Sequence, residues 1–303
     1  MRLPVVHHPY YVAPMPSGHR FPMAKFGRLM TYLLEDNVVA PAQIHRPELA
    51  PAAWLEQAHT PAYVEAALGL KLDAAAERRL GLPVTPEVVR RARAANGGTI
   101  LTARLALEHG LACNTAGGSH HAFADHGSGF CVFNDVAVAA RVLLAEARIE
   151  RVLVVDLDVH QGDGTAAICA HDPRIHTFSM HCRTNFPLRK QTSDLDVALD
   201  ADLEDDAYLA LLAEHLPGLL EEVRPDLVFF NAGVDPHVDD RLGRLALTER
   251  GLWRRERLVL ETCLGAGVPV AGVIGGGYAP DLEQLVRLHS ILHWVAGEFA
   301  QRL

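Results

Sequence analysis

The stretch RVLVVDLDVHQGDGT, residues 151–165, passes directly from an apolar run into three acids and a histidine. The run before the acids is β-branched and nearly continuous, which is typical of a strand buried on both faces. Because side chains alternate along a strand, we expect Asp156, Asp158 and His160 on one face and Leu157 on the other. Burying an unpaired carboxylate costs several kcal/mol, so these acids need hydrogen-bonding partners or a cation. The stretch therefore predicts a strand that ends in a polar or metal-binding site.

The composition of the chain limits the class of protein to which it can belong. Its 303 residues are 49% hydrophobic, and no repeat or Gly/Ser linker interrupts them, so we expect one domain over residues 1–303. No apolar run approaches the roughly 20 residues of a membrane span, and the N-terminus lacks the apolar core of a signal peptide. Five cysteines without a CxxC spacing favour the reducing cytoplasm.

The charge of the chain bears on its partners. The formal net charge of −9 argues against a nucleic-acid surface, which needs clusters of basic residues. The same charge is compatible with a cationic substrate. Neither composition nor charge predicts an oligomeric state.

Helical and strand patterns alternate along the chain. Alternation of this kind predicts an α/β fold with a parallel sheet and helices on both faces. Ligands in such folds bind outside the carboxyl ends of the strands. The expected helices cover 85–110, capped by Thr85, 134–148, capped by Asn134, 205–224 and a segment from about 280, and the expected strands cover 111–117, 151–158, 175–181, 226–233 and 269–277.

Polar motifs follow four of these strands. They are GGSHHAFADHGSGFCVFND (117–135), the acids after 151–155, VDPHVDD (234–240) and GGGY (275–278). Each has an ordinary structural explanation: a capping network for the acids, an Asx turn at Asp235, loop histidines in the first motif, and a flexible turn or phosphate cradle at GGGY. Because all four meet at one edge of the predicted sheet, we expect a functional site there.

The residue types at this edge suit a catalytic metal. Asp158, His160 and Asp235 offer one nitrogen and two carboxylate ligands, which leaves positions open for water and a substrate oxygen. Without cysteine ligands, zinc is favoured, and ferrous iron and manganese are also compatible. The pattern predicts a site that activates a water molecule.

The remaining polar residues suit acid–base chemistry. The adjacent His120 and His121 can each be oriented by one of the two spare acids, Asp156 and Asp163. The phenol of Tyr278 can donate a hydrogen bond to a developing oxyanion. Together with a metal, these groups predict a hydrolase.

The four motifs, in this order and at these separations, resemble the blocks of the histone deacetylase family. The resemblance extends over about residues 5–290, and the start, HHPYYVAPMPSGHRFPMAKF, is most similar to bacterial and class IV members. It implies an open fold related to arginase, with a mostly parallel sheet of about eight strands between helices.

The resemblance also implies roles for individual residues. His121 is the general base and then acid, backed by Asp163; His120 is its electrostatic partner, supported by Asp156; and Tyr278 polarises the scissile carbonyl. The zinc ligands are Asp158, His160 and Asp235; the acyl-lysine channel involves Gly129, Phe130 and Phe186; and a structural potassium is bound by Asp156, Asp158, His160, Ser179 and Met180.

The implied reaction is removal of acetyl or longer acyl groups from the lysine ε-amino group of proteins. Two alternatives remain open: a deacetylase of small acetylated amines such as polyamines, and a non-catalytic acyl-lysine binding protein. One segment departs from the family. Class I members carry an aspartate that grips the substrate backbone before the helix starting here near Thr85, whereas RRLGLPVTPE (78–87) has no acid before Glu87.

Overall fold

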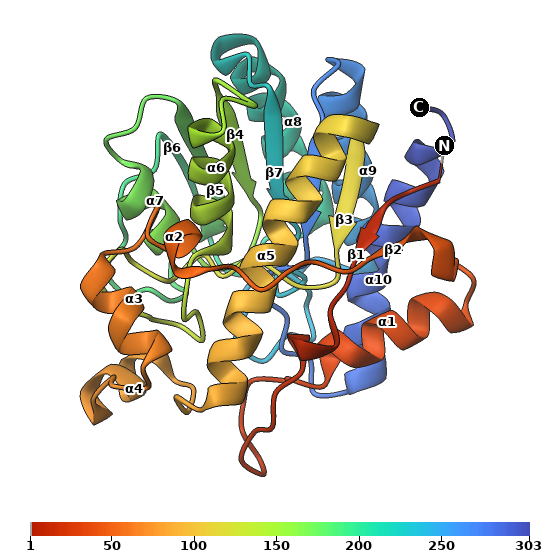
Figure 1. The fold of residues 1–303 in the computed structure, drawn as a ribbon. Helices are drawn as coiled ribbons and strands as arrows, with labels where there is room; N and C mark the ends of the chain where they lie inside the picture. The colour runs from red at the N-terminus through yellow and green to blue at the C-terminus, as the bar shows by residue number, and fades with distance from the viewer. Residues whose placement is uncertain (1) are drawn as a thin grey trace.

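An eight-stranded sheet organises the computed structural model, which describes residues 2–303 (Figure 1). All neighbouring strands are parallel, in the order β2-β1-β3-β8-β7-β4-β5-β6. The predicted α/β class and parallel sheet are therefore confirmed. The strands are β1 (Val5–Val6), β2 (Ile44–His45), β3 (Leu111–Asn114), β4 (Val152–Asp156), β5 (Ile175–Cys182), β6 (Leu195–Leu199), β7 (Leu227–Asn231) and β8 (Val270–Val273).

Ten α-helices surround the sheet in the described part of the chain. They are α1 (Lys25–Glu35), α2 (Ala52–Leu55), α3 (Pro61–Leu68), α4 (Ala74–Leu80), α5 (Pro86–His109), α6 (Asp135–Ala145), α7 (Asp163–Cys169), α8 (Asp205–Val223), α9 (Glu249–Gly265) and α10 (Leu282–Ala300). Within residues 2–303, none of them is long and apolar enough to cross a membrane. Short 3₁₀ turns cover Pro9–Tyr11 and Pro41–Gln43.

The predicted helix starts are confirmed. The Thr85 hydroxyl accepts the backbone N–H of Val88 at 3.2 Å, and the Asn134 side chain accepts that of Ala137 at 3.0 Å. Both bonds satisfy amide groups that a first helical turn leaves unpaired. The helix from Thr85 ends at Gly110, which adopts a left-handed conformation with φ of +80°.

The structure contains elements that the sequence patterns did not predict. β1 and β2 are two residues each, too short to show a period. Helices α1 to α4, α7, α9 and the edge strand β6 also lie outside the predicted set. Four of the five predicted strands end earlier than expected, and only that over 175–181 continues, by one residue, to Cys182. The strand over 269–277 stops at Val273, because the glycines beyond it form a loop.

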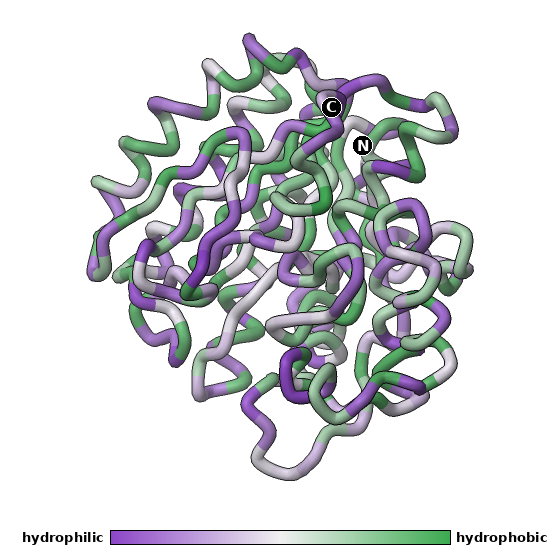
Figure 2. Tube along the Cα trace, turned by 90° about the vertical axis from the view of Figure 1, so that its left-hand side faces the viewer, coloured by the Kyte–Doolittle hydropathy of each residue, from purple (hydrophilic) through white to green (hydrophobic). Residues whose placement is uncertain are grey.

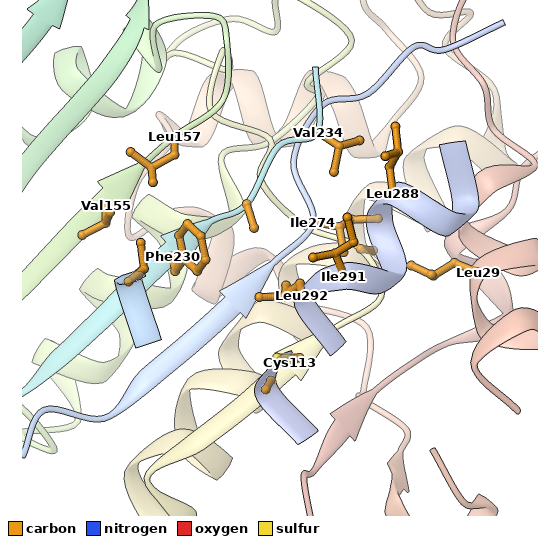
Figure 3. Close-up of a cluster of buried hydrophobic side chains, with 14 of the residues drawn as sticks. Leu29, Cys113, Val155, Leu157, Phe230, Val234, Ile274, Leu288, Ile291 and Leu292 are labelled. Atoms are coloured by element: carbon orange, nitrogen blue, oxygen red, sulfur yellow. The ribbon is translucent and has the colours of Figure 1, made fainter. Parts of the chain in front are cut away.

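Alternating side chains divide the core between the two faces of the sheet. On β4, Leu153 and Val155 belong to one buried cluster, and Val152 and Val154 to the other. Figure 3 shows the first cluster, in which β4 and β7 residues meet side chains of α10 such as Ile291. Helices α1, α8, α9 and α10 contribute to this cluster, and α6 covers the other face. Hydrophobic and hydrophilic residues alternate along the outer helices (Figure 2).

Candidate active site

The carboxyl ends of the central strands bring the predicted site residues together. Asp156 is the last residue of β4, and Asn231, the last residue of β7, lies beside it in register. Asp158 and His160 follow in the turn after β4, outside the strand itself. The alternation expected there nevertheless continues, because Leu157 is buried in the same apolar cluster as the β4 residue Val155.

The three predicted metal ligands form one buried cluster. Asp158, His160 and Asp235 each offer a ligand atom, and these atoms all lie within 4.8 Å of one another. His160 Nδ1 is 3.0 Å from Asp158 Oδ1 and 3.0 Å from Asp235 Oδ2. Because two carboxylate oxygens and an imidazole nitrogen converge with little exposed surface, their chemistry fits a divalent cation bound by nitrogen and oxygen.

Backbone amides hold the two carboxylates in this position. Asp158 Oδ2 accepts the N–H of Gly276 at 2.7 Å, and Asp235 Oδ1 accepts that of Val159 at 2.9 Å. A Cβ at Gly276 would lie 2.2 Å from an Asp235 oxygen, so this loop can approach the cluster only without a side chain.

The electrostatics of this cluster favour positive charge. Burial alone would lower the pKa of His160, but its hydrogen bonds to Asp158 and Asp235 raise that pKa to about 10. Burial, reinforced by the charge of Asp158, raises the pKa of Asp235 to about 7. The two buried carboxylates therefore stabilise the protonated form of the His160 imidazole. A metal cation bound between the three residues would supply the same positive charge.

Two His–Asp pairs lie next to the metal cluster. His120 Nδ1 is 2.7 Å from Asp156 Oδ2, and His121 Nδ1 is 2.6 Å from Asp163 Oδ1. The two imidazole rings are 4.1 Å apart between centroids. All four side chains are buried, and Asp163 starts α7, an element that the sequence patterns did not predict.

The two histidines differ in their pKa. Burial would lower the pKa of His120, but the charges of Asp156 and Asp158 outweigh it and raise that pKa to about 9. Burial and the charge of His120 lower the pKa of His121 to about 4. Near neutral pH the pair therefore holds one charged and one neutral imidazole.

Tyr278 lies across the same space from the histidines. Its ring centroid is 6.3 Å from that of His160 and 6.0 Å from that of Phe130. Its backbone N–H donates to Asp240 Oδ2 at 2.6 Å, which ties the loop after β8 to the loop after β7. Burial, followed by the charges of Asp235 and Asp158, raises the pKa of Tyr278 well above that of a free phenol, so it stays protonated.

The predicted channel residues line a cavity that leads to these groups. The cavity has a volume of about 410 Å³, and His121, His160, Tyr278, Gly129, Phe130 and Phe186 are among its lining residues. The ring of Phe186 lies 4.8 Å from that of His121 between centroids, at 85°. A Cβ at Gly129 would lie 2.6 Å from His121 Cδ2, so this wall packs directly on the imidazole.

The residues implied for a potassium site are also close together. Ser179 on β5 is in register with Asp156 on β4, and Met180 follows it, both buried. The Ser179 hydroxyl is 2.9 Å from His181 Nδ1. Potassium binding at these residues stays a prediction.

Three residues at the site were given no role from the sequence, although Asp240 lies within the predicted motif at 234–240. Asn231 donates to Asp156 Oδ1 at 2.9 Å, and Asp240 holds Tyr278 as described above. Lys25 on α1 is buried, and its ammonium donates to the carbonyls of Gly275 and Gly277 at 3.2 and 3.4 Å. Asn231 is a polar residue ending an apolar strand, a signal that could have found it, whereas Lys25 carries no local signal.

Comparison with known proteins gives the family of this chain. Residues 19–291 match the histone deacetylase domain. An uncharacterized protein of Picosynechococcus sp. is 60% identical over 296 residues, which cover 98% of this chain and 99% of that protein. Histone deacetylase 2 of Arabidopsis thaliana is 31% identical over 280 residues, which cover 88% of this chain and 72% of that protein.

A solved structure has the same fold. The crystal structure of the HDA15 HD domain superposes with a TM-score of 0.79 at 21% sequence identity, covering 99% of this chain and 92% of that one. The predicted arginase/deacetylase-like architecture is thereby confirmed. With the domain match spanning most of its length and the same fold, the chain belongs to the histone deacetylase family.

Proposed function

We propose that the chain is a metal-dependent amidohydrolase that removes acetyl or longer acyl groups from the ε-amino group of protein lysine. The observation that carries this proposal is the buried Asp158–His160–Asp235 cluster, whose His160 lines a cavity together with His121 and Tyr278. Membership of the histone deacetylase family supports the same reaction. We also propose that residues 1–303 act as one catalytic domain.

Asp158, His160 and Asp235 would hold the metal, and their donor set favours zinc. When bound, the metal supplies a Lewis acid that polarises the amide carbonyl and makes a water molecule more acidic. Asp158 and Asp235 keep their positions through the backbone amides of Gly276 and Val159.

His121 is the general base in this proposal. Its Nδ1 donates to Asp163, so Nε2 carries the free lone pair and can accept a proton. Its low pKa, about 4, keeps it neutral at physiological pH. His120, held by Asp156 at 2.7 Å and 4.1 Å from His121 between ring centroids, is the electrostatic partner of the base. His121 then returns its proton to the leaving amine.

Tyr278 supplies the oxyanion donor. Its phenol remains protonated over the working pH range and faces the same cavity as His121 and His160. A neutral donor fixed in a site from which water is largely excluded stabilises the tetrahedral oxyanion more than the ground-state carbonyl. The walls of Gly129, Phe130 and Phe186 suit an extended acyl-lysine side chain.

Chelation and a ligand substitution test the metal. Activity on an acetyl-lysine fluorogenic peptide should disappear with a chelator and return with added zinc. His160→Ala should lose metal content and activity together, because it removes one of only three protein ligands. His171→Ala, at an exposed histidine, is the matched control and should retain both. Full metal content in His160→Ala, or activity that resists chelation, would contradict the proposal.

A further inference from the structure

The mouth of the cavity carries a cluster of positive charge. Arg20, Arg78, Arg79 and Arg244 are exposed and line the cavity together, and we call them the arginine rim. Over residues 2–303, no aspartate or glutamate lines this cavity, and no ion pair involves any of the four guanidinium groups. This local charge is opposite to the formal net charge of −9 for the whole chain.

Three separate segments place these arginines, and each is fastened to a wall of the cavity. Arg78 and Arg79 lie in the last turn of α4, which ends at Leu80, and the carbonyl of Leu80 accepts the N–H of Phe130 at 2.8 Å. In Figure 1, α4 lies at the lower left, and the loop before α1, which carries Arg20, lies at the bottom.

The other two segments are fastened in a similar way. The neighbours of Arg20, His19 and Phe21, pack on the ring of Phe130 with centroids 6.2 and 5.4 Å away. Near Arg244, the carbonyl of Leu242 accepts a hydrogen bond from Asn185 at 2.5 Å. The backbone that carries the rim is therefore held relative to the channel, while the guanidinium groups remain free to bind.

The ordinary structural role of arginine explains only part of the rim. Arg78 and Arg79 lie in the last turn of α4, where positive charge interacts favourably with the helix dipole. Arg20 and Arg244 lie outside all helices, so that explanation does not apply to them. Four unpaired cations from three segments around one opening indicate recognition of negative charge.

We propose that the arginine rim binds carboxylates of residues that flank the acylated lysine, so that the preferred substrates are acidic protein segments. This inference rests on the proposed deacylase function. Guanidinium groups bind carboxylates in paired hydrogen bonds, and a field of one sign also speeds encounter with oppositely charged partners. Acetylpolyamines and lysine-rich segments carry positive charge, so the rim disfavours them.

The rim also has an apolar neighbour. Phe186 and Leu188 line the same cavity with 43% and 95% of their surface exposed. Acidic segments that also carry an apolar residue near the acyl-lysine would cover both kinds of surface.

The test uses one acetyl-lysine peptide in three versions, with flanking residues changed to Asp/Glu, Ser/Gln or Lys/Arg. We expect kcat/KM for the acidic peptide to exceed that for the neutral peptide by about fivefold or more at low salt, since each exposed ion pair contributes modestly. The difference should shrink as salt is added, because exposed charges are screened. The basic peptide should be the poorest substrate.

Charge reversal makes the test specific. The double substitution Arg78→Glu/Arg79→Glu should reverse the order of kcat/KM between the acidic and basic peptides. Arg244 lies outside any helix, so Arg244→Glu should shift that order in the same direction without disturbing α4. Arg151→Glu is the matched control. Arg151 is exposed and precedes β4 at the amino end of that strand, whereas the cavity lies beyond the carboxyl ends of the strands. It should leave the order unchanged.

Other outcomes separate this inference from the function on which it rests. Equal kcat/KM for the three peptides would overturn the inference and leave the deacylase function standing. The same holds if the Arg→Glu variants keep the wild-type order of kcat/KM among the peptides. A preference that follows a carboxylate on the acyl chain of a succinyl-lysine peptide would do the same. Faster turnover of N-acetylspermidine than of the acidic peptide would overturn the inference and the assignment of protein lysine as substrate, and would leave only the amidohydrolase chemistry. Failure to hydrolyse any acylated amine would overturn the proposed function and the inference together.

Discussion

At the scale of single residues, the candidate site depends on proton positions that burial sets. His120 and His121 are neighbours in sequence, yet their pKa values lie on opposite sides of neutrality, at about 9 and about 4. Burial lowers the pKa of both rings, but the charges of Asp156 and Asp158 outweigh it at His120. At His121 the charge of His120 adds to burial, and the hydrogen bond to Asp163 does not offset them. This asymmetry supports the proposed assignment of His121 as base and His120 as electrostatic partner.

Substitution of the two histidines tests that assignment. His121→Ala should lower kcat by about two orders of magnitude or more, the usual loss for a general base, while metal content stays full. The measurement is steady-state kinetics on an acetyl-lysine peptide together with metal analysis. A severe loss in His120→Ala combined with a nearly active His121→Ala would reverse the two roles.

The phenol of Tyr278 provides a second test at this scale. Tyr278→Phe keeps the ring packed near Phe130 but deletes the donor, so kcat should fall by about 10² to 10³ with a smaller effect on KM. Tyr10→Phe, at an exposed tyrosine, is the matched control. A trifluoroacetyl-lysine substrate, whose carbonyl is already activated, should be affected less. Wild-type kcat for Tyr278→Phe on acetyl-lysine would remove the oxyanion role.

At the scale of elements, helix α9 supports the loops that carry the ligands. Arg255 on α9 is fully buried, and its Nη1 donates to the carbonyls of Leu157 and Gly233 at 3.1 and 2.8 Å. Its other nitrogens pair with Glu256 at 2.7 Å. One guanidinium therefore joins the turn after β4 to the turn after β7, the two turns that present the predicted metal ligands.

The buried pair gives a prediction about stability. Arg255→Met should lower the free energy of unfolding by about 3 kcal/mol or more, because it leaves Glu256 buried without a partner. Adding Glu256→Gln should recover part of the loss. Arg254→Met next to it removes only an exposed pair with Asp206 and should cost less than about 1 kcal/mol. Urea titration measures all three variants, and equal losses at positions 254 and 255 would contradict this account.

At the scale of the whole molecule, the distribution of charge matters more than its sum. A formal net charge of −9 is compatible with a cationic substrate, yet the cavity mouth is lined by arginines alone among the charged side chains of residues 2–303. Substrate selection depends on the field at the opening, where the substrate first makes contact. The summed charge instead governs the average repulsion between molecules.

Stability in acid is also a property of the whole fold. His59 is buried, its Nδ1 donating to the carbonyl of Phe123 and its Nε2 accepting the N–H of Asn134, both at 2.9 Å. Burial lowers its pKa from 6.5 to about 4, so the folded state binds fewer protons than the unfolded state between these values. The contribution of His59 to the free energy of unfolding is therefore fully present above pH 6.5 and is lost as the pH falls toward 4. The total loss is about 3 kcal/mol.

Urea titrations from pH 7.5 to 4.5 measure this loss. The wild type should lose stability steadily below pH 6.5, and His59→Gln should show a shallower slope because no proton is taken up at that position. His171→Gln, at an exposed histidine, should keep the wild-type slope. Parallel curves for the wild type and His59→Gln would show that His59 is not a source of acid sensitivity.

The sequence by itself was enough for the centre of the fold and for most of the candidate site. Strands such as β4 can be recognised in the sequence because a strand buried on both faces needs an unbroken apolar run. The polar residues that follow such strands come together because the carboxyl ends of parallel strands meet at one side of the sheet. Asp158, His160 and Asp235 could be selected as a group for this reason. These signals lie within a few residues of one another along the chain.

Only the tertiary structure decided the contacts between distant segments. β1 and β2, two residues each, exist because neighbouring strands satisfy their backbone groups, not because of their own pattern. Lys25 reaches glycines some 250 residues away, and Arg255 joins two loops from a helix with no local mark of that role. The arginine rim arises in the same way, since three unrelated segments become neighbours only when the chain closes around one cavity. Packing, and not local preference, sets such proximity.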